Sequence, residues 1–205
     1  AKAQAYLRAA LERLHVEVRS GVEITKVLPD AVEIDQRTLL PSDATVWTTG
    51  FRASPLAGEA GIAVDDAGRI IVDDSLRSTS HPTIWAIGDA AAIVQTWGVI
   101  HGTCQSGIPS AAFAADAIAR ELRGKWPKQF RFGYIHQPVS LGRRDGVIQF
   151  TKADDSPRRM QLTGSRAARY KELVTSSPPS TYGLSRHLNI PRAMLSARGG
   201  RKNRR

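Results

Sequence analysis

One short stretch restricts the possible folds of the chain most. In it, an apolar run ends at Gly88-Asp89 and a long helical pattern follows. Residues 83–87 are typical of a strand buried on both faces of a parallel sheet. Residues 103–123 are Ala-rich and predict the clearest helix of the chain. This order is typical of α/β folds that bind ligands at the carboxyl ends of their strands. Gly88 lets a ligand approach the backbone closely, and Asp89 can accept hydrogen bonds from sugar-like hydroxyls. A plain turn shows the same two residues, so both interpretations stay open.

The charge of the chain is concentrated near its end. The 205 residues carry 29 Lys and Arg against 19 Asp and Glu, a formal net charge of +10. Residues 156–205 hold 12 bases and one acid, whereas residues 1–155 hold 17 bases and 18 acids. The first three quarters therefore lack the basic surface of a general nucleic-acid-binding protein. Residues 198–205 are predicted to form a basic disordered tail, with contact to lipid headgroups or nucleic acid as the alternative.

The composition also indicates the cellular compartment in which we expect the protein. No run of about 18 apolar residues occurs, so the sequence predicts no membrane-spanning helix. Cys104 is the single cysteine and cannot form an internal disulfide, and no Cys/His cluster has the spacing of a zinc site. We therefore expect a cytoplasmic protein, with peripheral contact at the inner face of the membrane through the basic C-terminus as an alternative.

The first three quarters of the sequence predict a helix and several short strands. Leucines spaced i, i+4 and i+7 predict a helix over residues 2–14. Trp47 and Trp85 are expected to fill the core between sheet and helices. Apolar patterns predict strands, besides 83–87, at residues 16–18, 22–28, 32–34, 45–49, 69–72, 130–134 and 147–150.

Prolines shape the expectations for the helices. Pro109 suggests that the regular part of the long helix starts nearer Ile108. Two further helices are expected at residues 166–174 and 182–188, because the breaker at residues 176–180 contains two prolines.

A series of motifs follows in order at close spacing. It consists of Thr45–Phe51, Gly68–Asp73, His81–Ala91 and Thr103–Pro109, and then Gly133-Tyr134, Leu141-Gly142 and Gly146. This ordered set resembles the C-terminal half of pyridine-nucleotide-dependent flavoproteins of the type with two dinucleotide-binding domains. Within them it is most similar to the type II NADH dehydrogenases. The resemblance covers roughly residues 5–175.

The resemblance implies a fold class and a division of the chain. The fold would be α/β, with the C-terminal portions of Rossmann-like FAD- and NAD(P)-binding domains and a small α+β C-terminal region. The implied parts are the end of the NAD(P)H-binding domain (1–44), the second half of the FAD-binding domain (45–127), the α+β region (128–197) and the basic tail (198–205).

The resemblance also implies FAD and NAD(P)H as cofactors, with hydride transfer from nicotinamide to flavin. The implied cofactor contacts are Gly50, Gly88, Asp89 and Gln105, with Asp89 on a ribityl hydroxyl of FAD. The helix beginning near Gln105 would face the pyrimidine edge of the flavin, where a helix N-terminus favours the negative charge of the reduced ring. No residue stands out as an acid–base catalyst, and no metal site is expected.

Two departures restrict these implications. No G-x-G-x-x-G motif occurs, although such flavoproteins use two, so we expect a fragment that is inactive alone. In quinone-reducing members a second glutamine follows four residues after the one matching Gln105, and here that position is Pro109. This departure counts against quinone, so the electron acceptor stays unidentified, with a quinone or another acceptor as the alternatives. The alternative function is a non-catalytic α/β binding module whose basic C-terminus docks on an acidic partner, a membrane or nucleic acid.

Several other residues invite a chemical interpretation. Cys104 lacks the second cysteine of a dithiol mechanism and is expected to be a small, partly buried residue. His101 and Trp97 precede the long helix, where the flavin ring would lie; for His101 a proton relay is the alternative to a packing or surface role. The carboxylate pairs are expected to be solvated turn residues: Asp65-Asp66 and Asp73-Asp74.

Overall fold

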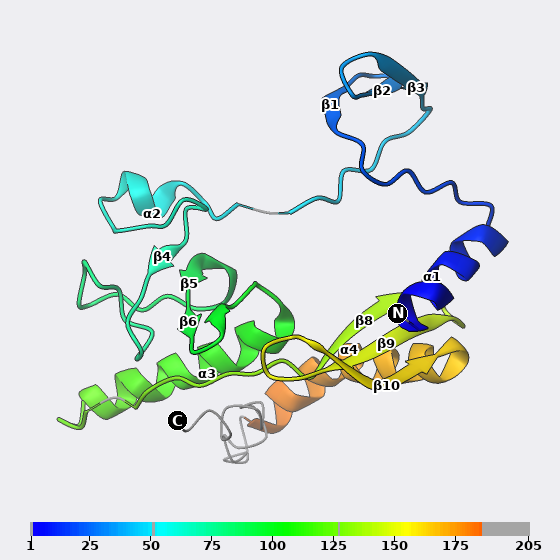
Figure 1. Cartoon of the computed structure of the whole chain (residues 1–205). Helices are drawn as coiled ribbons and strands as arrows, with labels where there is room; N and C mark the ends of the chain where they lie inside the picture. Colours follow the sequence, from blue (N-terminus) through cyan, green and yellow to red (C-terminus); the bar gives the residue numbers. More distant parts are fainter. Residues whose placement is uncertain (1, 51, 127, 186–205) are drawn as a thin grey trace. The chain divides into compact units, whose positions relative to one another are not determined.

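The computed structural model of the chain describes residues 2–50, 52–126 and 128–185 (Figure 1). The chain divides into two compact units, Ala1–Phe51 and Arg52–Arg205. The predicted basic tail lies outside the described residues.

The first unit consists of a helix and a three-stranded meander. α1 (Lys2–Arg13) agrees with the predicted helix. Three antiparallel strands follow in the order β1 (Ile24–Val27), β2 (Ala31–Ile34) and β3 (Thr38–Pro41). Asp35 has a φ of +52° in the turn between β2 and β3, as tight hairpin turns require.

Two strands predicted for this unit are absent from the described residues. Residues 16–18 and 45–49 have an extended or irregular backbone with no paired neighbour among them. Val46 is 83% exposed and Trp47 is 56% exposed, so the prediction that Trp47 fills the core was wrong. An apolar alternating pattern produces a strand only where a neighbouring strand accepts its hydrogen bonds and covers its apolar face. β3, which we did not predict, has such a neighbour in β2.

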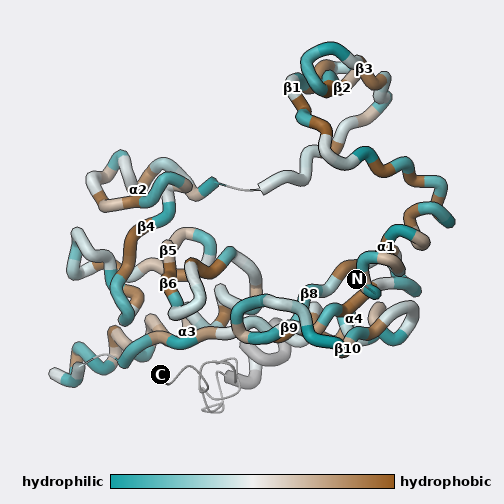
Figure 2. Tube along the Cα trace, in the orientation of Figure 1, coloured by the Kyte–Doolittle hydropathy of each residue, from teal (hydrophilic) through white to brown (hydrophobic). Residues whose placement is uncertain are grey.

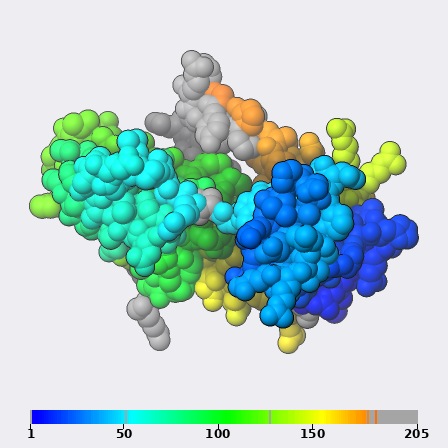
Figure 3. All heavy atoms as spheres, turned by 90° about the horizontal axis from the view of Figure 1, so that it is seen from above, coloured from blue at the N-terminus to red at the C-terminus, as the bar shows by residue number. Residues whose placement is uncertain are grey.

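The second unit begins with short elements around an apolar core. They are α2 (Leu56–Glu59), β4 (Ile70–Ile71), the 3₁₀ turn η1 (Gly88–Ala90), β5 (Ala91–Ala92), β6 (Val94–Gln95), β7 (Gly98–Val99) and α3 (Cys104–Glu121). β4 and β5 pair in parallel, and β6 and β7 form a hairpin. Apolar residues are concentrated at β4 and between β5 and β6 (Figure 2), whereas α2 lies at the surface (Figure 3). The buried core consists of Val72, Leu76, Ala86, Ala91, Ile93, Ile100, Phe130, Phe132 and Tyr134.

The buried parallel strand predicted at residues 83–87 was wrong. Within the described residues, its only pairing is an isolated antiparallel bridge between Trp85 and Arg77. Pro82 removes one backbone donor at its start, and β4 pairs with β5 instead. Trp85 nevertheless packs against the core, as predicted, and the Arg77 guanidinium lies 4.7 Å from the centroid of its ring.

α3 confirms the predicted long helix but begins earlier than Pro109 suggested. It starts at Cys104, not near Ile108, because Thr103 caps it. The Thr103 N–H donates to Ser106 Oγ at 3.1 Å, as in a capping box. Pro109 is accommodated as a buried residue inside the helix.

The rest of the second unit is a three-stranded antiparallel sheet followed by a helix. The strands are β8 (His136–Ser140), β9 (Gly146–Thr151) and β10 (Pro157–Thr163), in the order β10-β9-β8. The predicted strand at residues 147–150 is confirmed as part of β9. The helix is α4 (Gly164–Ser185), which contacts all three strands.

The prediction of a strand at residues 130–134 was wrong about its hydrogen bonds but right about the alternation of buried side chains. Phe130, Phe132 and Tyr134 are buried, as alternate residues facing a core should be. Their N–H groups do not join a sheet ladder; they donate to Asp74 O, Gln95 Oε1 and Ala153 O at 2.7, 3.0 and 3.1 Å. Irregular partners therefore replace a neighbouring strand.

α4 contradicts the predicted break at residues 176–180. One helix passes through Pro178, although proline has no N–H to donate to the carbonyl four residues earlier. Ser177 Oγ donates to that carbonyl, Val174 O, at 2.8 Å. A hydroxyl group thus replaces the backbone hydrogen bond that Pro178 cannot make. Residues 186–188 of the second predicted helix lie outside the described residues.

Candidate functional site

The predicted site residues Gly88 and Asp89 lie in η1, directly against the first turns of α3. The Gly88 N–H donates to Ser110 Oγ at 3.1 Å, and this hydroxyl donates to Gly107 O at 2.8 Å. Ser110 is completely buried. A single buried hydroxyl on α3 therefore fixes the turn to the helix.

Two glycines face each other at this contact, and the backbone conformation of Gly88 is the feature that favours glycine. Gly88 has a φ of +55°, a left-handed conformation that favours glycine. A Cβ added to it would lie 3.6 Å from Gly107 Cα, and a Cβ on Gly107 would lie 4.0 Å from Gly88 Cα. Gly107 was not among the predicted site residues. A glycine inside a helix costs about 1 kcal/mol relative to alanine, which is a weak sequence signal, and an added Cβ would make only an ordinary contact here.

Asp89 is exposed, and no hydrogen bond or ion pair to its carboxylate occurs among the described residues. Its neighbour in space is the N-terminal part of α3, which contacts η1. The first N–H groups of a helix have no intrahelical partner. The structure thus brings an unpaired carboxylate and a helix start together, which suits a ligand with both hydroxyl and anionic groups.

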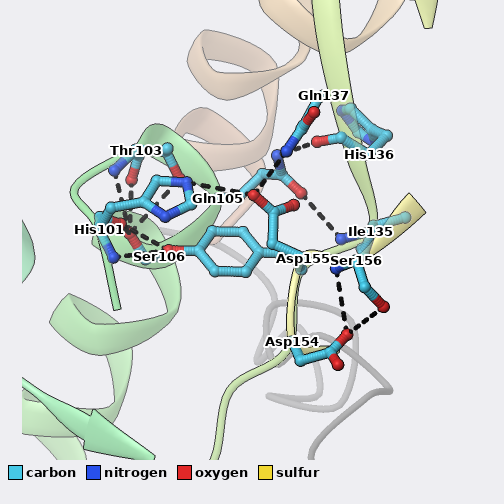
Figure 4. Close-up of polar contacts among 11 residues, drawn as sticks. His101, Thr103, Gln105, Ser106, Ile135, His136, Gln137, Asp154, Asp155 and Ser156 are labelled. Atoms are coloured by element: carbon cyan, nitrogen blue, oxygen red, sulfur yellow. Dashed lines mark hydrogen bonds and ion pairs between the residues drawn. The ribbon is translucent and has the colours of Figure 1, made fainter. Parts of the chain in front are cut away.

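The side chain of Gln105 has a different role from the predicted one. Its Nε2 donates to His136 O at 2.7 Å, and its Oε1 accepts from the Ile135 N–H at 3.2 Å (Figure 4). Both ends of the amide are used to join α3 to the start of β8. A ligand at this position would instead bind to the backbone N–H groups of the first turn of α3. Gly50 belongs to the first unit, where it is exposed and has no atom within 4 Å of an added Cβ.

A second cluster lies at the same end of α3, around Tyr134. The Tyr134 hydroxyl donates to His101 O at 2.7 Å and accepts from the His101 N–H at 2.9 Å. The two rings stack with centroids 4.4 Å apart and planes 10° apart. Burial raises the pKa of Tyr134 to about 12; the bond to the His101 carbonyl opposes this effect and the charge of Asp155 adds to it. The tyrosine is therefore neutral at any physiological pH.

Asp155 completes this cluster from the turn between β9 and β10. Its side chain is only 15% exposed, and its φ is +63°. One oxygen, Oδ2, accepts from Gln137 Nε2 at 2.7 Å and lies 3.5 Å from His101 Nε2 (Figure 4). The other oxygen, Oδ1, is buried and has no hydrogen-bond partner among the described residues.

His136 lies buried between the sheet and α4. Its Nδ1 is 3.3 Å from the Tyr170 hydroxyl, and its ring meets those of Phe150 and Tyr170 edge to face. Burial lowers the pKa of His136. The neutral imidazole is therefore the form that this site favours.

The remaining predicted residues have mainly structural surroundings. Cys104 is exposed on the first turn of α3, so the expectation of a partly buried residue was wrong. Trp97 packs against the core. Asp65 and Asp73 accept hydrogen bonds from backbone N–H groups two residues on, which confirms them as turn residues. Within the described residues, no group of three or more His, Cys, Asp or Glu side chains could hold a metal, and no helix is long and apolar enough to cross a membrane.

Comparison with known proteins gives a family match and several relatives. Residues 1–116 match the family model described as pyridine nucleotide-disulphide oxidoreductase. An NADH dehydrogenase-like protein of Mycobacterium tuberculosis is 35% identical over 108 residues, which cover 52% of this chain and 27% of that protein. A type II NADH:quinone oxidoreductase of the same organism is 29% identical over 157 residues, or 70% of this chain and 33% of that protein. The chain thus spans about a third or less of the length of these curated relatives.

Solved structures share the fold. The sulfide:quinone oxidoreductase of Aquifex aeolicus matches with a TM-score of 0.64 at 17% identity, over 82% of this chain and 42% of that one. An FAD-dependent pyridine nucleotide-disulphide oxidoreductase of Desulfovibrio vulgaris matches with a TM-score of 0.50 at 25% identity, over 71% of this chain and 37% of that one. These likenesses confirm the predicted α/β fold with partial Rossmann-like domains.

Proposed function

Because the chain belongs to the pyridine nucleotide-disulphide oxidoreductase family, we propose that it is part of an FAD-dependent NAD(P)H oxidoreductase of the NADH dehydrogenase-like kind. The names of its relatives support both cofactors, since they include an NADH oxidoreductase and an FAD-dependent enzyme. When bound, FAD would supply the redox chemistry by accepting a hydride from the nicotinamide. The protein's part is to bind, orient and provide a suitable electrostatic environment.

One observation carries this proposal: the glycine-mediated contact of η1 with α3, with the Asp89 carboxylate unpaired beside it. Gly88 and Gly107 leave a backbone surface without side chains, which suits close contact with a nucleotide. Asp89 would accept a hydrogen bond from a ribityl hydroxyl of FAD. The backbone N–H groups at Gln105 would favour negative charge at the pyrimidine edge of the flavin. Gly50, from the first unit, is proposed as a further backbone contact.

For the electron acceptor, we propose a quinone. The support is that relatives of this chain are named NADH:quinone oxidoreductases. Pro109 is buried inside α3 and offers no side-chain donor where quinone-reducing members have a second glutamine. The acceptor would therefore be bound with a different set of polar groups in this protein.

We also propose that the parts of the chain correspond to those of the larger enzymes. Residues 1–44 would close the NAD(P)H-binding domain, residues 45–127 would form the second half of the FAD-binding domain, and residues 128–197 would form the C-terminal α+β region. This assignment places Asp89 and α3 in the FAD half of the site.

The test is to purify the product of the whole gene and measure flavin absorbance near 450 nm and NADH oxidation. We expect a yellow protein that oxidises NADH. Asp89→Ala should weaken FAD binding about tenfold, because a hydrogen bond to a charged group contributes about 1.5 kcal/mol. The matched control is Asp66→Ala, an exposed turn residue of the same unit, which should bind FAD normally. A colourless wild-type protein that does not take up added FAD would refute the proposal.

A further inference from the structure

His101 is positioned to exchange a proton at the end of α3 that faces η1. It lies two residues before the N-cap Thr103, so the helix start and the imidazole share one end of the helix. Its side chain is 57% exposed, and the stack on Tyr134 fixes the plane of its ring. Nε2 faces Asp155, whereas Nδ1 has no partner among the described residues (Figure 4). The ring therefore offers one nitrogen to a carboxylate and the other to solvent or a ligand.

The Asp155 carboxylate faces that ring and has few other polar partners. Its carboxylate is mostly buried, receives one amide hydrogen bond from Gln137, and keeps one oxygen without a partner. A buried carboxylate in this state is costly unless a cation lies close to it. Among the described residues, His101 is the only base within 4.0 Å of the carboxylate. The titratable groups that contact His101 are Asp155 and Tyr134, and the latter is neutral.

The backbone conformation of Asp155 supports a specific placement of this carboxylate. A φ of +63° is uncommon for a residue with a side chain, and aspartate and asparagine tolerate it best. The turn thus holds the carboxylate against the imidazole at a small cost in backbone strain. An asparagine fits the same conformation and keeps an acceptor for Gln137, so it removes the charge with little other change.

We propose that Asp155 and His101 form a proton-donating pair for the reduction of the electron acceptor. This proposal rests on the function proposed above. A quinone takes up two electrons and two protons to become a quinol. The hydride of NAD(P)H supplies both electrons and one proton, so each turnover draws a second proton from solvent. His101 gives this proton from Nδ1 to the quinone oxygen and is protonated again from water. Asp155 is a positioning residue that stabilises the imidazolium through Nε2, as a carboxylate does for a catalytic histidine elsewhere.

The kinetic test uses the whole gene product loaded with FAD, with the two half-reactions followed separately by anaerobic stopped flow. The variants are His101→Gln and Asp155→Asn. Reduction by NADH should stay within twofold of the wild type in both. Reoxidation by a soluble quinone should slow about 100-fold in His101→Gln, since a positioned general acid contributes 10²–10⁴-fold, and by a smaller factor in Asp155→Asn. Free imidazole should restore part of the rate in His101→Ala.

Matched controls and a second acceptor sharpen the result. His81→Gln, at another histidine of the unit, and Asp154→Asn, in the same turn as Asp155, should leave both half-reactions unchanged. Ferricyanide takes electrons without protons, so its reduction should not respond to either variant. Unchanged quinone reoxidation in His101→Gln, or equal losses with ferricyanide, would overturn the pair. A wild type that NADH does not reduce would instead overturn the proposed function.

A double-mutant cycle tests the pair without any cofactor. Urea unfolding of the whole gene product without FAD is measured for wild type, His101→Gln, Asp155→Asn and the double variant, at low and at high salt. A partly exposed ion pair should change the folding equilibrium about two- to fivefold at low salt. High salt should weaken this coupling, because it screens partly exposed charges. Coupling that is absent at low salt, or equal at low and high salt, would contradict a charge pair.

Discussion

Replacing Tyr134 by phenylalanine should test how the end of α3 is held together. The change removes one hydroxyl that both donates to His101 O and accepts from His101 N, at 2.7 and 2.9 Å. Phenylalanine keeps the ring and its packing in a site where the tyrosine is 3% exposed. The His101 N–H then loses its partner, whereas His101 O keeps the hydrogen bond from Ser106 Oγ at 3.3 Å. A backbone group without a partner costs about 1–3 kcal/mol when no water replaces it. We expect the free energy of unfolding at pH 8 to fall by that amount.

The same variant should change the response to alkali. The folded-state pKa of Tyr134 is about 12, above the ordinary value of 10.0, because the buried site disfavours the phenolate. A group whose pKa is raised on folding gives stability that is complete below pH 10 and is lost as the pH rises towards 12. A difference of two pKa units corresponds to about 2.7 kcal/mol at most. Tyr134→Phe should lack this part of the alkaline loss.

The assay is urea unfolding followed by circular dichroism at pH 8, 10 and 11, with Tyr6→Phe in the first unit as the control. Tyr134→Phe should be less stable than the wild type at pH 8, and the difference should shrink at pH 11. If the two proteins are equally stable at pH 8, the hydroxyl does not hold the His101 backbone as described. If their difference stays constant up to pH 11, the tyrosine is not shielded from ionisation.

Three further substitutions address the C-terminal sheet and its junction with α3. Gly146→Ala places a Cβ 2.8 Å from Val139 O, so the free energy of unfolding should fall by about 1–3 kcal/mol in thermal melting. The control Gly58→Ala should be tolerated. An unchanged melting temperature for Gly146→Ala would contradict the strand register. Burial lowers the pKa of His136, so its contribution to folding stability is present above about pH 6.5 and is lost as the pH falls below it. His136→Phe should therefore make stability depend less on pH on the acid side. An unchanged difference in stability between pH 5 and pH 7, measured by urea unfolding, would refute this. Gln105→Leu should lower the free energy of unfolding by about 1–3 kcal/mol, because the amide bonds to the backbone at the start of β8. The affinity for FAD should stay within a fewfold of the wild type. A large loss of affinity without a loss of stability would show a direct contact between the side chain and the cofactor.

How far the sequence predicts this structure depends on whether the signal is local. α3 was predictable because its alanines and its ending are local features, and only its start was misplaced, since the cap at Thr103 outweighs Pro109. Strands needed information that a local pattern does not contain. Residues 83–87 and 130–134 have strand-like composition, yet within the described residues neither enters a sheet. The neighbours that accept their hydrogen bonds are loops and single side chains.

The same distinction applies to the candidate site. Gly88 and Asp89 follow an apolar run, and this order alone pointed to the turn that the structure places on α3. Gly107, Ser110 and Asp155 could not be selected in this way, because their roles arise from contacts with residues 19, 22 and 54 positions away along the chain. Family resemblance locates a site, whereas its supporting contacts depend on tertiary structure.

Gln105 can contact a cofactor through its backbone while its side chain has a structural role. The resemblance attached a cofactor contact to this position, and the structure assigns both ends of its side chain to β8. Residue 105 can serve both roles if its backbone N–H meets the cofactor while its side chain fixes the first turn of α3. In that arrangement Gln105 anchors one side of the helix start and Ser110 the other, through Gly88. The anchored turn carries His101 just before it, so the flavin site and the proton-donating pair proposed here depend on the same few hydrogen bonds.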